Sequence, residues 1–341
     1  MPIARKILNF LVPVLAVVAI TVILLLVIGA NVPLVFSRFL AGIFGSKYQI
    51  GEVFVKATPL ILAGLGCSIG FKCGFINLGA EGQLYIGALA ATTAAIFGAG
   101  LPRPLLLLLM IGAAFFAGGI WSLVPGVMKA KFGLSEVIMC LMFNYIAIQL
   151  NALSIRTWLK DPGYPFPMSA AFSENAQLPL LMSRTRLHAG ILLALLAAVF
   201  VWLFLWKSAR GFQIRACGTN PRASHCVGIN VNANLILSAL ISGGLAGLAG
   251  FVEVSGVQHK LMDGISSNYG YMAVMVALLG RNHPVGVVVA GILLAMLDIG
   301  SLAIQRQVQV PSSLSQVILG VIIVVFLLQH QILHRGERRN A

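Results

Sequence analysis

The residues of this chain best suited to chemistry lie in a short polar run, residues 77–83, that interrupts apolar sequence. An ionisable side chain such as Glu81 at the centre of a membrane span costs about 2.5–3.5 kcal/mol, so this carboxylate needs a partner or a polar cavity. Asn77 and Glu81 are four residues apart, which predicts a shared helix face. Two interpretations stay open. Asn77, Glu81 and Gln83 line a solute path in a broken or tightly packed segment, or Glu81 lies near the interface and hydrogen-bonds locally.

Three more polar residues interrupt or border apolar runs. Asn144 falls in the middle of a predicted span and must hydrogen-bond, either to another helix or to a solute. Glu136 begins that span, where a helix N-terminus stabilises a carboxylate by about 0.3–1 kcal/mol. Asp298 is either an interfacial or paired acid or a proton-coupling site. An ion-coupled secondary transporter that uses Glu81 or Asp298 is therefore an alternative function.

Motifs for covalent or metal chemistry are absent from the sequence, which contains no GxxxxGK[ST], HExxH or GxSxG. The cysteines form no CxxC pair, and Cys217, His225 and Cys226 fit no zinc spacing. We expect no metal, no cofactor and no catalysis in this chain, although an enzyme site assembled from distant residues would leave no motif. Active transport would need an ion gradient or a separate ATP-hydrolysing subunit.

Composition places the chain in a membrane. Of its 341 residues, 59% are hydrophobic and 9% are charged, whereas soluble domains carry about 25% charged residues. Several apolar runs exceed the ~20 residues that cross a bilayer. The net charge of +14 is distributed over short loops between these runs, which is typical of membrane proteins and does not favour nucleic-acid binding. We predict one all-α polytopic domain over residues 1–341.

About ten transmembrane helices are predicted, with a short interfacial helix over residues 34–44. The spans are residues 7–29, 53–70, 75–97, 104–128, 137–155, 189–206, 235–254, a short run at 272–279 with preceding residues, 285–303 and 317–333. A proline-rich loop, residues 156–187, separates the fifth and sixth spans and is expected outside the cell. Lys and Arg are slightly more numerous in the loops on the same side of the membrane as the termini than in the loops on the opposite side. We therefore expect both termini and residues 207–234 in the cytoplasm.

Residues 207–234 form the longest basic interruption of the apolar sequence. Pro221 can occupy the first turn of a helix, and residues 222–228 would then form about two turns with Arg222 on the polar side. Two interpretations stay open here as well. The segment is a docking element for a partner on the inner face of the membrane, or a solvated basic connector.

Four stretches together resemble a known family. GFINLGAEGQLYIGA (74–88), EVIMCLMFNYIA (136–147), RACGTNPRASHCVGINV (215–231) and VPSSLSQVILGVII (310–323) occur in the order found in permease subunits of bacterial ABC importers for nucleosides and simple sugars. The similar branch is served by basic-membrane-protein-type binding lipoproteins. The resemblance covers about residues 51–328.

This resemblance implies a vitamin-B12-importer-like (type II importer) architecture in the bacterial inner membrane. Two permeases, identical or homologous, pack around a central path, an external lipoprotein delivers the solute, and a separate ATPase subunit binds ATP and Mg. The loop after the sixth span docks on that ATPase. Carried over to this sequence, the coupling residues are Arg215, Gly218, Asn220, Ala223, Gly228 and Ile229, to which the basic helix adds Arg222. The family's Asn-x-Gly-x-Glu-Gly-Gln motif falls on Asn77, Gly79, Glu81, Gly82 and Gln83.

The sequence departs from the family pattern at three places. Ile76 precedes the motif where Phe is common, Ser224 follows Ala223 where the family often has a second Ala, and Cys140 replaces a hydroxyl residue. These departures leave the transporter class unchanged.

Overall fold

The computed structural model describes residues 31–308 and a few helical residues outside that range (19, 20, 22, 23, 25, 26, 317, 320, 321 and 325). The described part is helical, and its only β pairing is isolated bridges. Most of the predicted spans 7–29 and 317–333, the motif at 310–323 and both termini lie outside the described residues. Within the described part, six helices are long and apolar enough to cross a membrane, which supports a multi-pass membrane protein without testing the number ten.

The described chain forms two compact units, whose boundaries fall within helices α3 and α12. The helices are α2 (Val32–Phe44), α3 (Lys47–Cys73), α4 (Ala80–Phe97), α5 (Arg103–Phe132), α6 (Glu136–Ser154), α7 (Gly190–Lys207), α8 (Ala209–Thr219), α9 (Pro221–Cys226), α10 (Val231–Glu253), α11 (Tyr269–Leu279) and α12 (Pro284–Val308). A 3-10 turn (Glu174–Ala176) precedes α7, and a π-helical turn (Val254–Gln258) continues α10.

The first unit comprises Met1–Val53 and Leu293–Ala341. Its described part contains α2, which confirms the short helix expected at residues 34–44. Asn31 caps α2 by accepting a hydrogen bond from the Leu34 N–H at 3.2 Å. Small residues let α2 approach α12 closely, since a Cβ added to Gly42 would overlap that of Ala303.

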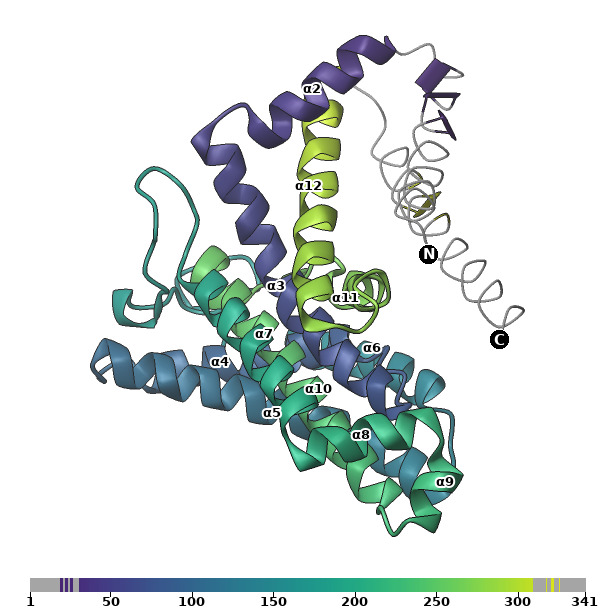
Figure 1. Ribbon diagram of the computed structural model, residues 1–341. Coiled ribbons are helices and arrows are strands. Elements are labelled where there is room, and N and C mark those ends of the chain that lie inside the picture. Colours follow the sequence, from purple (N-terminus) through teal and green to yellow (C-terminus); the bar gives the residue numbers. More distant parts are fainter. Residues whose placement is uncertain are drawn as a thin grey trace. The chain divides into compact units, whose positions relative to one another are not determined.

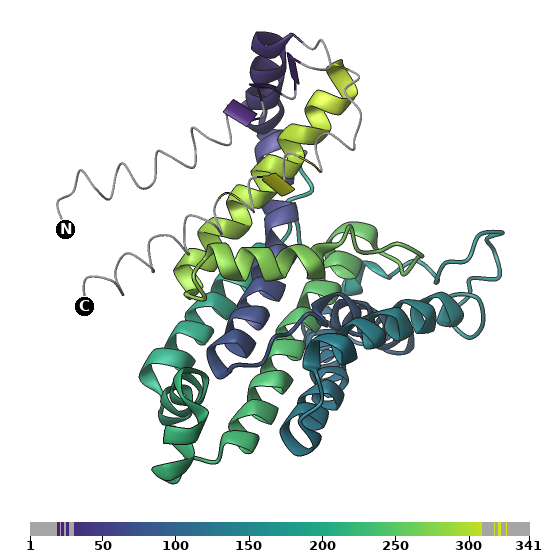
Figure 2. The ribbon, with the colours of Figure 1, turned by 90° about the vertical axis from the view of Figure 1, so that its right-hand side faces the viewer.

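The second unit, Phe54–Ile292, is built around α10, which packs against α5 and α4 (Figures 1 and 2). Most of α10 is buried, because glycines let its backbone contact its neighbours. A Cβ on Gly247 would overlap the Ala114 carbonyl oxygen of α5, and one on Gly250 would overlap the Leu84 carbonyl oxygen of α4. The small-residue spacing of this segment is thus used for close helix packing.

The expected spans agree with the helices in most places, with two corrections. The span predicted over residues 75–97 becomes helical only at Ala80, because residues 74–79 form a separate turn. Residues 207–234 are largely helical, as α8 and α9, where we expected a loop with one short helix. Ser208 explains α8, because its Oγ accepts a hydrogen bond from the Gly211 N–H at 3.0 Å and caps the helix.

The long segment 156–187 is hydrogen-bonded to the chain that follows α10. The Ser169 N–H donates to the Leu261 carbonyl at 2.9 Å, and the Leu261 N–H donates to Ser169 Oγ at 2.8 Å. Further along, Ser255 Oγ donates to the Ala176 carbonyl at 2.6 Å. Backbone polar groups of this loop are therefore paired with protein, as they must be where the loop is buried.

Candidate functional site

The turn of residues 74–79 joins α3 to α4 and shapes the site. Gly74 has a φ of +82°, a left-handed conformation that suits glycine and reverses the chain after α3. Asn77 then lies before α4, not on it, so the predicted helix face shared with Glu81 is wrong. Asn77 Oδ1 accepts a hydrogen bond from the Gly79 N–H at 2.9 Å, which is the local bonding by which Asn favours turns over helices.

Asn77 pairs with Gln83 instead of sharing a face with Glu81. Asn77 Nδ2 donates to Gln83 Oε1 at 2.8 Å, and Gln83 Nε2 donates to Asn77 Oδ1 at 2.9 Å. Asn77 Nδ2 also donates to Ser242 Oγ of α10 at 2.7 Å. This arrangement satisfies the amide of Asn77 and ties the turn to both α4 and α10.

Glu81 is buried in the first turn of α4 and faces the start of α11. Its carboxylate accepts a hydrogen bond from the Gly270 N–H at 2.7 Å, and further bonds from the Ser266 hydroxyl and the Tyr271 N–H. These N–H groups belong to the first turn of α11, where a helix has unpaired donors. Glu81 therefore caps α11 from a neighbouring helix. A Cβ on Gly270 would overlap the backbone of Glu81, so this position needs glycine.

Asn144 joins α6 to α4. Its Oδ1 accepts a hydrogen bond from the Gly82 N–H at 2.8 Å, and its Nδ2 donates to the Leu78 carbonyl at 2.9 Å and to the Tyr271 hydroxyl at 3.4 Å. Helix-to-helix bonding was one of the two interpretations of Asn144, and the structure contains it. Gly82 permits this contact, since an added Cβ would lie 2.8 Å from the Asn144 Cα.

These four side chains form what we term the polar cluster, Asn77, Glu81, Gln83 and Asn144. All four are buried, with relative exposures of 0–2%, and each is bonded within the protein. The segment is broken, as the first interpretation allowed, whereas the carboxylate of Glu81 is bonded to the start of α11, 189 residues along the chain, and not to the local partners of the second interpretation. The partners contributed by Ser242, Ser266 and Tyr271 had no signal in the local sequence pattern, because they come from distant segments.

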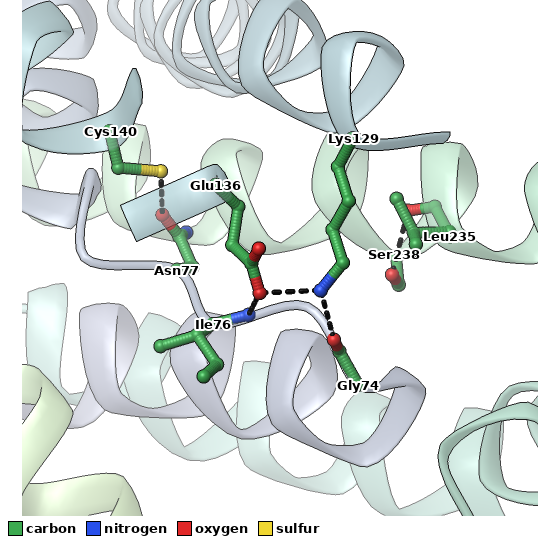
Figure 3. Close-up of polar contacts among 8 residues, drawn as sticks. All are labelled: Gly74, Ile76, Asn77, Lys129, Glu136, Cys140, Leu235 and Ser238. Carbon is green, nitrogen blue, oxygen red and sulfur yellow. Dashed lines mark hydrogen bonds and ion pairs between the residues drawn. The ribbon is translucent and has the colours of Figure 1, made fainter. Parts of the chain in front are cut away.

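An ion pair between Lys129 and Glu136 holds the same turn from the α5–α6 side (Figure 3). Lys129 Nζ also donates to the Gly74 carbonyl, and Glu136 Oε1 accepts a hydrogen bond from the Ile76 N–H at 3.4 Å. Glu136 was expected to be stabilised by the N-terminus of its own helix, and it does begin α6. The sequence analysis missed Lys129. The sequence feature that could have predicted this ion pair is the opposite charge of Lys129 and Glu136 on either side of the turn at Gly133, which has a φ of +66°.

Helix α8 packs against the other end of this turn. Gly218 lies so close to α3 that an added Cβ would overlap the Lys72 carbonyl oxygen. Arg215 points toward Trp206, with its guanidinium 5.6 Å from the ring centroid, and Lys72 Nζ lies 5.9 Å from the same ring. His283 contacts Trp206 edge-on at 4.8 Å between ring centroids. Arg215 is thus engaged with the protein and only half-exposed.

The short helix expected to start at Pro221 is present as α9 and ends at Cys226. Asn220 caps it, with its Oδ1 accepting from the Ala223 N–H at 3.1 Å, and Gly228 follows it at a φ of +83°. Of the seven expected coupling residues, five are exposed, namely Gly218, Asn220, Arg222, Ala223 and Gly228, while Arg215 and Ile229 are half-buried. Two exposed apolar side chains in this region, Phe212 and Val227, were not foreseen.

The remaining acidic candidate is Asp298. Asp298 is on α12 in the other compact unit, and its carbonyl accepts a hydrogen bond from Ser301 Oγ at 2.8 Å. Within the described part of the chain, no group of three or more His, Cys, Asp or Glu side chains is placed to hold a metal ion.

Comparison with known proteins identifies the family. The family described as "Branched-chain amino acid transport system / permease component" matches residues 49–327. The chain is 38% identical over 329 residues to the guanosine ABC transporter permease protein NupP of Bacillus subtilis (strain 168), covering 94% of this chain and 93% of the relative.

Two further relatives are also named as ABC permeases. The glucose ABC transporter permease protein TsgB13 of Haloferax volcanii is 34% identical, covering 85% of this chain and 78% of the relative. The nucleoside ABC transporter permease protein NupB of Lactococcus lactis subsp. cremoris is 31% identical, covering 85% of this chain and 83% of the relative. The resemblance to ABC permeases for nucleosides and sugars is confirmed, and the ion-coupled alternative finds no support. The chain belongs to the branched-chain amino acid transport system / permease component family.

Proposed function

We propose that this permease forms the translocation path of an ATP-driven importer for a nucleoside, with a simple sugar as the second candidate solute. The observation that carries the proposal is the likeness, over most of the chain, to relatives named for guanosine and nucleoside transport. The relative named for glucose transport supports the second candidate. The chain itself catalyses no covalent step.

The energy of ATP hydrolysis reaches the permease through the exposed face of α8 and α9. This face docks on a separate ATPase subunit that binds ATP and Mg. Five of the seven expected coupling residues are exposed, and Arg222 gives this face a positive charge. Gly218 lies against the end of α3, directly before the turn of residues 74–79. A movement of α8 would therefore reach the turn that carries Asn77.

The polar cluster then forms a buried layer of side chains behind the wall of the path. Its four side chains hold α4, α6, α10 and the start of α11 in one arrangement through hydrogen bonds of 2.7–3.4 Å. Because closely packed helices switch between discrete arrangements, an exchange of these hydrogen bonds would let the helices alternate between outward and inward access. The cluster supports the shape of the path from within the protein.

The complete importer contains a second permease, identical or homologous, and an external binding lipoprotein that delivers the solute. Segment 156–187 faces the outside in this arrangement, and both termini lie in the cytoplasm of a bacterial cell. We propose the ten-span type II architecture for each permease. The apolar faces that α5 and α7 expose are consistent with contact to lipid or to the second permease.

Reconstitution tests the proposal. Vesicles containing the permease pair and the ATPase, supplied with the lipoprotein outside and ATP and Mg inside, should accumulate radiolabelled guanosine. A proton gradient without ATP should give no uptake. Uptake that persists without ATP hydrolysis, and collapses with the gradient, would instead establish an ion-coupled carrier.

A further inference from the structure

Three membrane-length helices of the second unit expose one face, and α6 differs from the other two. In their central parts, α5 exposes only apolar side chains such as Leu109, Phe116 and Ile120, and α7 likewise exposes Leu196 and Phe200. The exposed face of α6 also carries polar groups. Its exposed residues are Ile138, Met142, Tyr145, Ile146, Gln149 and Leu153.

Tyr145 lies in the middle of α6, and Gln149 lies one turn nearer the C-terminal end of the helix on the same face. They are four residues apart, and Tyr145 is 63% exposed. At 1.5 Å per residue, Tyr145 lies about 14 Å from the start of the helix, deeper than the interfacial belts where tyrosines usually collect. Polar groups at this depth face a bundle interior or a water-filled cavity rather than lipid. The exposed face of α6 is therefore not a lipid-facing surface.

The polar patch is connected to the polar cluster behind it. Tyr145 is close enough to Tyr271 for the two phenols to interact electrostatically, and the Tyr271 hydroxyl accepts a hydrogen bond from Asn144. Toward the C-terminal end of α6, the Arg156–Asp263 ion pair, at 2.6 Å, is also exposed. Polar side chains are thus present along this face from the middle of α6 to its C-terminal end.

We propose that the face of α6 bearing Tyr145 and Gln149, with Tyr271 behind it, contacts the solute in transit, and that this solute is a neutral nucleoside. The inference rests on the function proposed above. Phenol rings offer flat faces on which a planar base stacks, a contact that tolerates any base. The amide of Gln149 provides both a donor and an acceptor for base edges or ribose hydroxyls. The centre of the patch carries no charge, which fits an uncharged solute.

Cysteine accessibility tests where this face lies. In the complete importer, on a Cys226→Ser background that removes the exposed native thiol among the described residues, Gln149→Cys is compared with Leu196→Cys on the apolar face of α7. A membrane-impermeant maleimide should modify Cys at position 149 and leave position 196 unmodified, and excess guanosine should slow the modification. A position 149 that the maleimide does not modify would place the face in lipid or in a closed interface between copies, and this result overturns the proposal.

Substitutions at Tyr145 test the chemistry of the contact. Tyr145→Phe keeps the stacking ring and should leave the KM for guanosine uptake within about twofold, whereas Tyr145→Leu should raise it about tenfold. The amount of inserted protein should not change. Equal KM values in both variants would overturn the proposal. If the unsubstituted importer transports glucose and not guanosine, the proposed solute is wrong. The labelling of position 149 still tests independently whether this face of α6 lies in the path.

Discussion

Lys129 and Glu136 form an ion pair across the turn between α5 and α6, and both also bond the backbone of the turn before α4. The Lys129 ammonium binds the Gly74 carbonyl, and the Glu136 carboxylate binds the Ile76 N–H. Two charged side chains thus bond two residues, Gly74 and Ile76, of a turn that also contacts α8. Figure 3 shows the pair next to Asn77, the first residue of the polar cluster.

Replacing Lys129 should loosen this turn. Lys129→Gln removes the ion pair and leaves Glu136 with the Ile76 N–H alone. Because both side chains are partly exposed, at 24% and 13%, we expect a modest loss of about 1–2 kcal/mol in stability. Thermal unfolding in detergent measures the change, and Lys131→Gln, two residues along the same helix, is the matched control. Equal unfolding temperatures for the two variants would contradict a holding role for the pair.

The contact of Gly218 with α3 should be required for coupling. Gly218→Ala places a methyl group into the Lys72 carbonyl oxygen and pushes α8 away from the turn. We expect ATP hydrolysis to continue while uptake per ATP falls, because the docking surface remains and its link to the turn is disturbed. Gly112→Ala on α5 is the control, since an added Cβ there meets nothing within 4 Å. Normal uptake per ATP in Gly218→Ala would remove this contact from the coupling route.

The sequence predicted the long helices because each of them is a continuous apolar run. Residues 104–128 and 137–155 were placed to within a few residues of α5 and α6. The errors occur where side chains compete with the helix backbone. Asn77 bonds its own turn and so leaves the helix, and Ser208 caps α8 in a stretch whose glycines suggested a loop.

The site could be found from the sequence only in part. The motif located Asn77, Glu81 and Gln83, because polar residues in an apolar run require partners. The partners themselves could not be read from the pattern. Ser242 is 165 residues from Asn77, and Gly270 is 189 residues from Glu81, so only the tertiary fold brings them together.

Removing the amide of Asn77 should affect transport more than insertion. Asn77→Ala leaves the Gly79 N–H, the Gln83 amide and the Ser242 hydroxyl without this partner in a buried site. A buried polar group left unpaired costs about 1–3 kcal/mol, so the broken segment should lose its fixed geometry. Uptake kinetics and the amount of inserted protein are measured together. Thr93→Ala is the control, because its hydroxyl bonds only the preceding turn of α4 at 2.8 Å. Unchanged uptake kinetics in Asn77→Ala would exclude the cluster from the path.

Acid should destabilise the protein through His188, which lies directly before α7. His188 is fully buried, its Nδ1 accepts a hydrogen bond from the Gly190 N–H at 3.1 Å, and its Nε2 has no hydrogen-bond partner in the described structure. Burial lowers the pKa of His188 from 6.5 to about 4, with smaller contributions from nearby His259 and Arg186. The folded protein therefore resists a proton that the unfolded chain accepts.

The sign of the pH effect follows from this lowered pKa. Above pH 6.5 the side chain is neutral in both states, and stability is at its full value. As the pH falls from 6.5 toward 4, the unfolded state gains a proton first, and the free energy of unfolding should fall by up to ~3 kcal/mol. Thermal unfolding in detergent between pH 7 and pH 4 measures this slope. His188→Asn keeps an acceptor near the position of Nδ1 without a titrating ring, so its slope should be shallower, whereas His225→Asn on exposed α9 should retain the original slope. Equal slopes in all three proteins would show that His188 is not the titrating group.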